Sequence, residues 1–340
     1  MIEVPFRLGE SAERAALIMI DPHGEIVWYR VRGPFLYGAA RRANGDLAYV
    51  SEGGTTGGRV WVETIDGRVL NQLLADPGVG LGAHHDVIVT PDNTLLVLSF
   101  DPQEVDGETI VGEAIWEWNP DTDELTKRWS SFDHLSVDDD WGEPSTADDW
   151  LHANSLGLGG DGSVLMSMRS VSQVISNAPD YRSIEYSLGG FDSPADIELL
   201  PDDQFQRQHT ATELSRAGSL RRILLFDNGI RARGYSRALE VEVDVDARTV
   251  RKVWEFVPPG NHAPFAGGAR RLKNGNTFIT MGSGAIRELY EVGPGGEVVW
   301  HLKAEGAELP ILYRATPLES LSGEREVAFP ASALVAPPLP

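Results

Sequence analysis

The stretch Trp150–Arg169 reads WLHANSLGLGGDGSVLMSMR and sets the pattern for the whole chain. Its Gly-Asp-Gly turn between two apolar runs predicts a β-hairpin. Folding the hairpin about this turn places Arg169 opposite His152, with Asn154 on the same face two residues along. These three side chains could hold a tetrahedral oxyanion, because Arg and Asn donate hydrogen bonds and His donates or accepts near neutral pH. The alternative is a polar hairpin end that caps its own backbone.

The composition describes an acidic protein. The chain has 340 residues, with 29 Lys and Arg against 51 Asp and Glu, which gives a formal net charge of -22. Nucleic acids and anionic membranes bind basic surfaces, so we expect neither as a partner. The absence of cysteine excludes disulfides, thiolate metal sites and cysteine nucleophiles. Composition leaves the oligomeric state open.

The first residues, Met1–Arg14, lack the basic flank and apolar core of a signal peptide. No apolar run elsewhere reaches the length of a membrane span. We therefore expect a cytoplasmic protein from the sequence as it stands, or a periplasmic or secreted one if the chain is a processed form.

One unit repeats along the chain. The 36 Gly and 21 Pro are spread over its whole length, and no long segment has a helical period, which predicts many short strands joined by tight turns. Each unit begins with a small residue or His, continues as an apolar run, turns at an Asn-Gly or Asp-Gly type pair and ends in a second apolar run. The units start near residues 38, 84, 152, 209 and 267, and Tyr313–Pro317 would begin a sixth.

Units of this size, each forming a four-stranded sheet, predict an all-β fold, a six-bladed β-propeller with a central channel. The N-terminal strands around Leu17–Trp28 would complete the last blade beside Tyr313–Leu321 and close the ring. We expect a single domain over residues 1–340. Within it we expect an N-terminal extension at 1–14, an acidic loop at 133–149 and a C-terminal tail at 325–340.

Histidines mark the start of several innermost strands, which line the channel of a propeller. Four of the eight histidines lie there, in three successive units: His84, His85, His152 and His209. A single histidine at a strand start is usually an ordinary core or surface residue. Equivalent positions in three units instead favour convergence on one axis.

The pair His84-His85 leaves open which ring faces the channel. Aligning the turn at Asp92 with that at Asp161 sets His85 level with Asn154. We therefore expect His85 to face the channel and His84 to pack or bond sideways. The adjacent Asp86 is expected to orient one of the two rings, as carboxylates beside working imidazoles do.

Two acidic segments have less definite meanings. The loop 133–149 contains Asp138–Asp140 and Asp148-Asp149, but it lacks the alternating ligands of a Ca²⁺ loop, so we expect a solvated loop near the channel mouth. Asp227-Asn228-Gly229 follows an apolar run and predicts either a simple turn or support for the His209 strand. The candidate substrate-binding residues are Arg169, Asn154, His84, Asp227 and Asn228.

Several phrases, in order and spacing, resemble one family. They are DDWLHANS (148–155), SMRS (167–170), RQHTA (207–211), LFDNG (225–229) and SRAL (236–239). This set is similar to the arylsulfotransferases that do not use the nucleotide sulfate donor, and the match is densest from Ala147 to Glu240. The resemblance implies a six-bladed propeller and a ping-pong exchange, in which a histidine takes a sulfuryl group from an aryl sulfate and passes it to a phenol.

The resemblance also implies roles for individual residues. By motif, His209 would be the nucleophile, and His152, Asn154 and Arg169 would bind and polarise the sulfuryl oxygens. His85 would be the further channel histidine. We find no counterpart for the family's hydroxyl contact from a later blade. The implied partners are a small aryl sulfate donor and a phenolic acceptor, and no cofactor or resident metal is implied.

Chemistry agrees with aryl rather than alkyl sulfates, because a phenol of pKa about 10 leaves more readily than an alkanol. Two alternatives remain. The same pocket could serve a hydrolase or lyase acting on another anionic or phenolic small molecule, with or without a metal such as Zn²⁺. The propeller could also be a non-catalytic scaffold that presents a binding surface.

Overall fold

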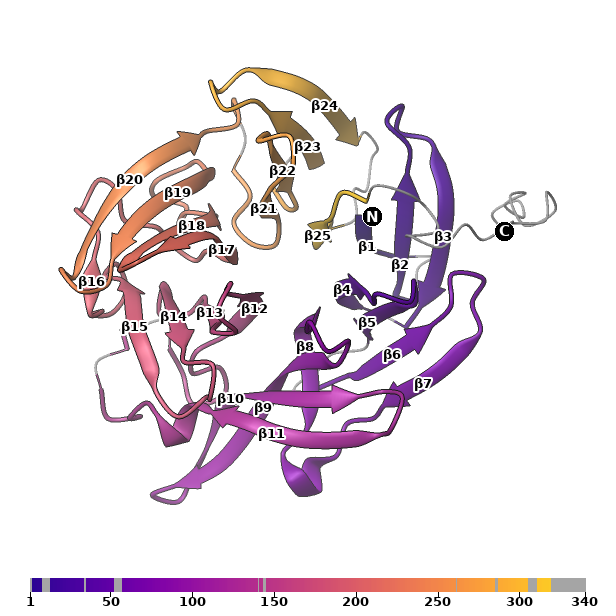
Figure 1. The fold of residues 1–340 in the computed structure, drawn as a ribbon, viewed down its shortest axis with the longest axis horizontal. Helices are drawn as coiled ribbons and strands as arrows, with labels where there is room; N and C mark the ends of the chain where they lie inside the picture. Colours follow the sequence, from indigo (N-terminus) through magenta and orange to yellow (C-terminus); the bar gives the residue numbers. More distant parts are fainter. Residues whose placement is uncertain are drawn as a thin grey trace.

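The computed structural model describes residues 2–7, 13–33, 35–51, 57–139, 141–142, 145–260, 262–284, 287–304 and 311–318. This part of the chain contains 25 β-strands and two short 3₁₀ helices, η1 (Pro77–Val79) and η2 (Ser131–Asp133). The predicted all-β propeller is confirmed, because the strands form sheets arranged around a central axis (Figure 1). None of the helices in these residues is long and apolar enough to cross a membrane.

The strands of the described residues pair into six sheets. Neighbouring strands run antiparallel, except that β15 and β16 are parallel. In hydrogen-bonded order the first three sheets are β25 (Arg314–Ala315), β1 (Ile2–Arg7), β2 (Glu13–Ile20) and β3 (Ile26–Arg32); β4 (Leu36–Arg41), β5 (Leu47–Ser51), β6 (Arg59–Glu63) and β7 (Val69–Leu73); and β8 (Gly82–Val89), β9 (Leu95–Val105), β10 (Glu108–Asn119) and β11 (Glu124–Ser130).

The remaining three sheets follow the same order around the axis (Figure 1). They are β12 (Ala153–Leu158), β13 (Val164–Met168), β14 (Gln173–Asn177), β15 (Ile184–Gly189) and β16 (Ile197–Glu198); β17 (His209–Ala217), β18 (Leu220–Asp227), β19 (Arg237–Asp244) and β20 (Thr249–Phe256); and β21 (Gly268–Arg271), β22 (Thr277–Met281), β23 (Arg287–Val292) and β24 (Val298–Ala304).

The hydrophobic core lies between the faces of adjacent sheets. The middle strands β5, β13 and β14 are buried along their whole length, whereas the outer strand β7 is half-buried or exposed. A strand covered on both faces reads as a continuous apolar run, and one face of an outer strand meets water. This explains why strong apolar runs in the sequence mark the middle of each sheet.

One sheet combines both ends of the described chain. Strand β1 pairs with β2 on one side and with β25 on the other, where Ile2 lies opposite Ala315 and Glu3 opposite Arg314. The expected extension at 1–14 is wrong for Ile2–Arg7, because hydrogen bonds to both neighbours make this segment a strand. The C-terminal tail expected at 325–340 lies outside the described residues.

The segment expected as an acidic loop, 133–149, contains no strand in its described part. Trp141 packs edge-on against Trp150 with ring centroids 5.8 Å apart, and a bridge joins Thr146 to Asp149. This segment therefore brings Asp149 to the start of the central hairpin. Asp140 lies outside the described residues.

Candidate active site

The innermost strands carry a register irregularity close to their starts. In β8 it falls between Ala83 and Val87, in β12 between Ala153 and Ser155, and in β17 between His209 and Thr212. A bulge adds one residue to a strand and redirects its side chains, and bulges concentrate next to active sites. The same places carry the left-handed backbone of His85 and His152, each with φ of 50°. Such conformations are uncommon for residues other than glycine and cluster at functional sites.

The predicted hairpin is present. The Arg169 amide donates to the His152 carbonyl at 3.0 Å, which sets the two residues opposite each other as the turn at Gly159–Gly162 implied. Asn154 lies within the β12 bulge and is fully buried. Its Nδ2 donates to the Gln208 carbonyl at 2.8 Å, so the side chain also ties β12 to the start of β17.

Three histidines from separate sheets meet at the centre. The rings of His85 and His152 lie with centroids 5.0 Å apart at an angle of 65°. Burial, followed by the charges of His152, His84 and His209, lowers the pKa of His85 well below its ordinary value. Charge interactions of this kind act over short range, so His209 belongs to the same cluster.

Aromatic rings complete one side of this cluster. Tyr37 from β4 stacks on His85 with centroids 5.0 Å apart, and Tyr313 meets Tyr37 edge-on at 5.2 Å. Burial raises the pKa of the Tyr37 hydroxyl. Neither tyrosine is predicted as part of the site, because each reads in the sequence as an ordinary aromatic residue near a strand.

His209 is held in one tautomer by Asn228. The side-chain nitrogen of Asn228 donates to the carbonyls of Ala263 and Ala266 at 2.7 and 2.8 Å, so both of its N–H groups are used. Its oxygen therefore faces the Nδ1 of His209, 2.7 Å away, and must accept a hydrogen from it. Nδ1 carries the proton, and the lone pair of His209 lies on Nε2.

His209 is also neutral at physiological pH. Burial, and then the nearby guanidinium of Arg169, lower its pKa to about 3, although the hydrogen bond to Asn228 opposes this shift. His152 and Arg314 contribute further repulsion of a proton. A neutral imidazole with a fixed, unprotonated Nε2 is a competent nucleophile.

His84 points sideways and is buried. Its Nδ1 lies 2.8 Å from the Nδ1 of His85, and its Nε2 lies 2.8 Å from a carboxylate oxygen of Glu113 in β10. The second oxygen of Glu113 accepts the amide hydrogen of Ala153 at 2.7 Å. Glu113 is not among the predicted site residues, since it lies 29 residues beyond His84 in the middle of an apolar strand and no local motif marks it.

The prediction that Asp86 orients one of the histidine rings is wrong. One carboxylate oxygen of Asp86 accepts from Nη1 of Arg314 at 2.7 Å, and the other accepts the amide hydrogen of Leu156 at 2.9 Å. The bulge and the left-handed backbone at His85 turn neighbouring side chains apart, which strict strand alternation does not anticipate.

Arg314, like Tyr37, Tyr313 and Glu113, is a site residue that was not predicted from the sequence. Its guanidinium is buried, bonds Asp86 and donates to the Asn154 carbonyl at 3.1 Å. Its charge lowers the pKa of both His85 and His209. The segment around it was predicted only to begin a sixth unit.

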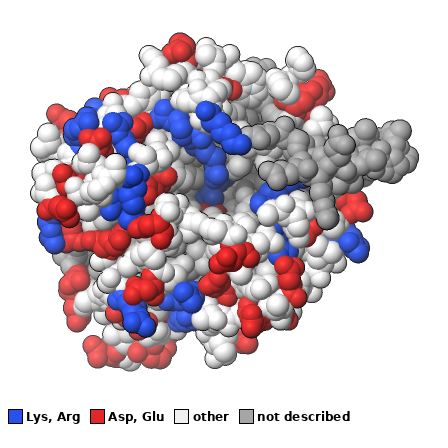
Figure 2. Space-filling model, in the orientation of Figure 1, with Lys and Arg blue, Asp and Glu red and all other residues white. Residues whose placement is uncertain are grey.

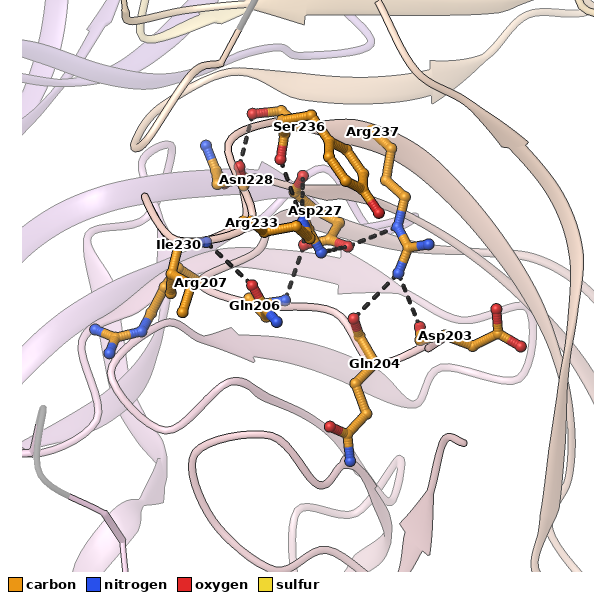
Figure 3. A network of polar contacts seen from close by, with 12 residues as sticks. Asp203, Gln204, Gln206, Arg207, Asp227, Asn228, Ile230, Arg233, Ser236 and Arg237 are labelled. Carbon is orange, nitrogen blue, oxygen red and sulfur yellow. Dashed lines mark hydrogen bonds and ion pairs between the residues drawn. The ribbon is translucent and has the colours of Figure 1, made fainter. Parts of the chain in front are cut away.

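Asp227 holds the loop beside His209 and does not face the channel. Its two oxygens accept from the Gln206 amide, from both terminal nitrogens of Arg233 and from Nε of Arg237, at 2.7 to 2.8 Å (Figure 3). All of these donors belong to the protein, and Asp227 is fully buried. Its expected contact with substrate is therefore replaced by a structural role, namely fixing the adjacent Asn228.

Arg169 brings an unpaired guanidinium nitrogen to the site within the described residues. Its side chain has no hydrogen-bond partner among the described residues, and its buried Nε is unpaired. Burial and the neighbouring charge of Arg207 lower its pKa, although a guanidinium stays charged at neutral pH. Figure 2 shows Lys and Arg side chains reaching into the hollow at the centre of the face that it draws. An anion could therefore be held here in spite of the acidic exterior.

Metal ligation has no ready framework in the described residues. They contain no group of three or more His, Cys, Asp or Glu side chains placed to hold a metal ion. The described site instead offers imidazole, amide and guanidinium groups, which suit an oxyanion.

Solved structures resemble the chain in fold. A protein of unknown function from Bacteroides caccae is 16% identical, with a TM-score of 0.56, covering 92% of this chain and 96% of that one. A periplasmic gluconolactonase of Pseudomonas aeruginosa is 13% identical, with a TM-score of 0.48, over 91% and 97% of the two chains. A virginiamycin B lyase of Staphylococcus aureus is 9% identical, with a TM-score of 0.46, over 88% and 84%. At these identities only the first likeness bears on the argument, and it concerns the fold.

A comparison with curated proteins gives no match. The sequence model of the family described as Arylsulfotransferase (ASST), in contrast, matches residues 6–311. This range spans all of the described sheets except β25 and the first residues of β1, and it includes the histidine cluster, Asn228 and Arg169. The chain belongs to the arylsulfotransferase family.

Proposed function

We propose that the protein transfers a sulfuryl group from an aryl sulfate to a phenol through a sulfo-histidine formed at His209. The observation that carries this proposal is the pairing of His209 with Asn228. Because both N–H groups of Asn228 are used by carbonyls, Nδ1 of His209 must carry the proton and Nε2 is left as a neutral nucleophile. Membership of the arylsulfotransferase family supports the sulfuryl group as the one transferred.

The proposal includes a propeller of six blades closed by strands from both ends of the chain. The six hydrogen-bonded sheets of the described residues support this number, and the pairing of β1 with β25 supports the closure. Closure matters for the site because β25 carries Arg314.

In the first half-reaction, Nε2 of His209 attacks sulfur, the N–S bond forms and the S–O bond to the aryl group breaks. Negative charge stays on the sulfuryl oxygens and develops on the leaving oxygen, as in phosphoryl transfer. Arg169, whose buried Nε has no hydrogen-bond partner among the described residues, would bind the sulfuryl oxygens. Removing one such donor typically costs about 100-fold or more in rate.

In the second half-reaction a phenol oxygen attacks the same sulfur and returns His209 to its free form. Tyr37 and Tyr313 give the site an aromatic wall beside His85. Offset or edge-on contact between aromatic rings favours an aryl group there by about 0.5–1.5 kcal/mol beyond simple burial. Donor and acceptor would use the wall in turn, which accounts for a ping-pong order.

The test is an intact-mass measurement after mixing the protein with 4-nitrophenyl sulfate. We expect a gain of one SO₃ group, which disappears when phenol is added and is absent in His209→Asn. The matched control is His23→Asn, which changes an exposed histidine in a turn and should label like the wild type. Release of nitrophenol without any adduct, or equal turnover with water alone as acceptor, would overturn the proposal in favour of hydrolysis.

A further inference from the structure

A buried carboxylate and two histidines form a continuous chain that the proposed nucleophile does not use. Glu113 contacts Nε2 of His84, and Nδ1 of His84 contacts Nδ1 of His85, each at 2.8 Å. Glu113 and His84 are almost fully buried. The remaining nitrogen of His85, Nε2, has no hydrogen-bond partner among the described residues, and its ring faces His152 in the channel.

The contact between the two Nδ1 atoms restricts where protons can lie. One Nδ1 must donate and the other accept, since two lone pairs or two N–H groups would repel. A carboxylate only accepts, so Nε2 of His84 carries a hydrogen in both arrangements. In the first arrangement His85 donates through Nδ1, and its Nε2 is a free base. In the second, His84 carries two hydrogens as imidazolium, and Nε2 of His85 carries a hydrogen that it can donate.

The surroundings decide which histidine can hold positive charge. Around His85 lie Tyr37 from β4, His152, His209, and Arg314 from β25, and within the described part of the chain no carboxylate contacts its ring. Burial and these neighbours lower the pKa of His85 well below its ordinary value. Asp86, on the same strand, is occupied by Arg314.

His84 has the opposite environment. It stacks on the apolar ring of Phe100 with centroids 3.9 Å apart, and Glu113 is the charged group in contact with it. A carboxylate within hydrogen-bond distance favours the protonated form of an imidazole. The contact with Glu113 therefore gives His84, and not His85, a carboxylate partner for a positive charge.

We propose that Glu113, His84 and His85 form a proton relay in which Nε2 of His85 exchanges a hydrogen with the aryl oxygen while the positive charge resides on His84. This rests on the proposed sulfuryl transfer and adds a general acid and base to it. His85 would touch the substrate, and His84 and Glu113 would act through it.

The relay balances over the two half-reactions. As the aryl S–O bond breaks, Nε2–H of His85 protonates the leaving oxygen, Nδ1–H of His84 passes to Nδ1 of His85, and the imidazolium charge is lost. As the acceptor phenol attacks, its hydrogen moves to Nε2 of His85 and the Nδ1 hydrogen of His85 returns to His84. The cycle neither consumes nor releases a net proton.

The test compares leaving groups in single-turnover labelling of the protein. Glu113→Gln can keep the bond from the Ala153 amide, but its amide nitrogen would face Nε2 of His84 and remove the partner that stabilises the imidazolium. We expect labelling by phenyl sulfate, whose leaving phenol has a pKa of about 10, to fall by about 100-fold or more. Labelling by 4-nitrophenyl sulfate, whose far more acidic phenol needs no proton, should change by less than about fivefold.

The control is Glu288→Gln, which alters another buried carboxylate paired with a histidine, His301, at 3.2 Å in the β21–β24 sheet. This variant should be labelled at the wild-type rate by both phenyl sulfate and 4-nitrophenyl sulfate. A purely structural role for Glu113 predicts equal losses with both donors, and that result would overturn the relay. If Glu113→Gln does not fold, His84→Asn breaks the chain without removing the acceptor of the Ala153 amide, and the same contrast between donors is expected. Absence of any label in the wild type would instead reject the sulfuryl transfer itself.

Discussion

Two histidines near the starts of innermost strands, His84 in β8 and His209 in β17, are held in different ways. His209 donates to the amide oxygen of Asn228, whereas His84 donates to the carboxylate of Glu113. The lengths, 2.7 and 2.8 Å, are nearly equal, and all four side chains are buried. The difference lies in charge: a neutral amide fixes a tautomer without stabilising imidazolium, while a carboxylate stabilises it.

In the proposed mechanism, this difference suits two kinds of chemistry within one cluster. A nucleophile must stay unprotonated, so an amide is the suitable partner for His209. A proton carrier must accept positive charge, so a carboxylate is the suitable partner for His84. The network around Asp227 supports His209 indirectly. Arg233 and Arg237 bind Asp227 and so fix the loop that carries Asn228, the partner of His209 (Figure 3).

Replacing the amide should give the largest effect. Asn228→Leu removes the acceptor of the His209 Nδ1 hydrogen, so the proton can move to Nε2 and block attack. We expect single-turnover labelling by 4-nitrophenyl sulfate to fall by about 100-fold or more, as when a histidine loses the group that fixes its tautomer. The free energy of unfolding should also fall by about 1–3 kcal/mol per unpaired carbonyl, measured by denaturant titration.

Asn71→Leu is the matched control, because it removes an amide that donates to the Pro120 carbonyl at 2.9 Å, far from the histidine cluster on the outer strand β7. It should label at the wild-type rate. A folded Asn228→Leu variant that labels equally fast would show that Asn228 does not set the tautomer.

The second test uses pH. Because the folded pKa of His209 is about 3, labelling by 4-nitrophenyl sulfate should remain fast at pH 5, where an ordinary histidine of pKa about 6.5 is mostly protonated. The rate should fall only as the pH approaches the folded pKa. A labelling rate that already falls as the pH is lowered from 7 to 6 would contradict a neutral, desolvated His209.

The same shift affects stability. Below pH 6.5 the unfolded chain binds a proton at His209 that the folded chain does not bind, so stability is lost as the pH falls toward 3. As the pH falls from 7 to 5, we expect the free energy of unfolding to decrease more steeply than in His209→Asn, by up to about 1.4 kcal/mol per pH unit. Denaturant titrations at pH 7, 6 and 5 provide the measurement. The same change in unfolding free energy with pH in the wild type and in His209→Asn would contradict the prediction.

The smallest effect is expected at the exposed carboxylate of the cluster. Asp149 contacts Nδ1 of His152 at 2.7 Å, but its side chain is 44% exposed and that of His152 is 26% exposed. Water screens such a pair, which is commonly worth less than about 1 kcal/mol. Asp149→Asn should therefore lower kcat/KM by about fivefold or less, and a loss of 100-fold would give His152 the charge-holding role assigned to His84.

The repeats and the central hairpin could be predicted because their signals are local. The Gly-Asp-Gly turn at 160–162 fixes the register of Arg169 against His152, and the structure has this register. Apolar runs such as Val164–Met168 identify buried middle strands in the same way. Turn chemistry and apolar patterning act over a few residues, which a sequence displays directly.

The missing parts of the site depend on contacts between sheets. Glu113 reaches His84 from the middle of another strand, and Arg314 reaches Asp86 from a strand 228 residues away. Asp86 was assigned to its neighbours in sequence, although the bulge in β8 turns it away from them. Strand alternation predicts faces, but bulges and partners from other sheets decide which polar groups meet.

The position of Arg314 has a consequence for how the enzyme matures. Strand β25 follows the other strands of the described residues, yet the guanidinium of its Arg314 bonds both Asp86 and the Asn154 carbonyl. A chain emerging from the ribosome can pair the strands of the intervening sheets while this cation is still unmade. The site is then completed only when β25, which follows those strands, pairs with β1, so the proposed sulfuryl labelling would report that these two distant segments have joined.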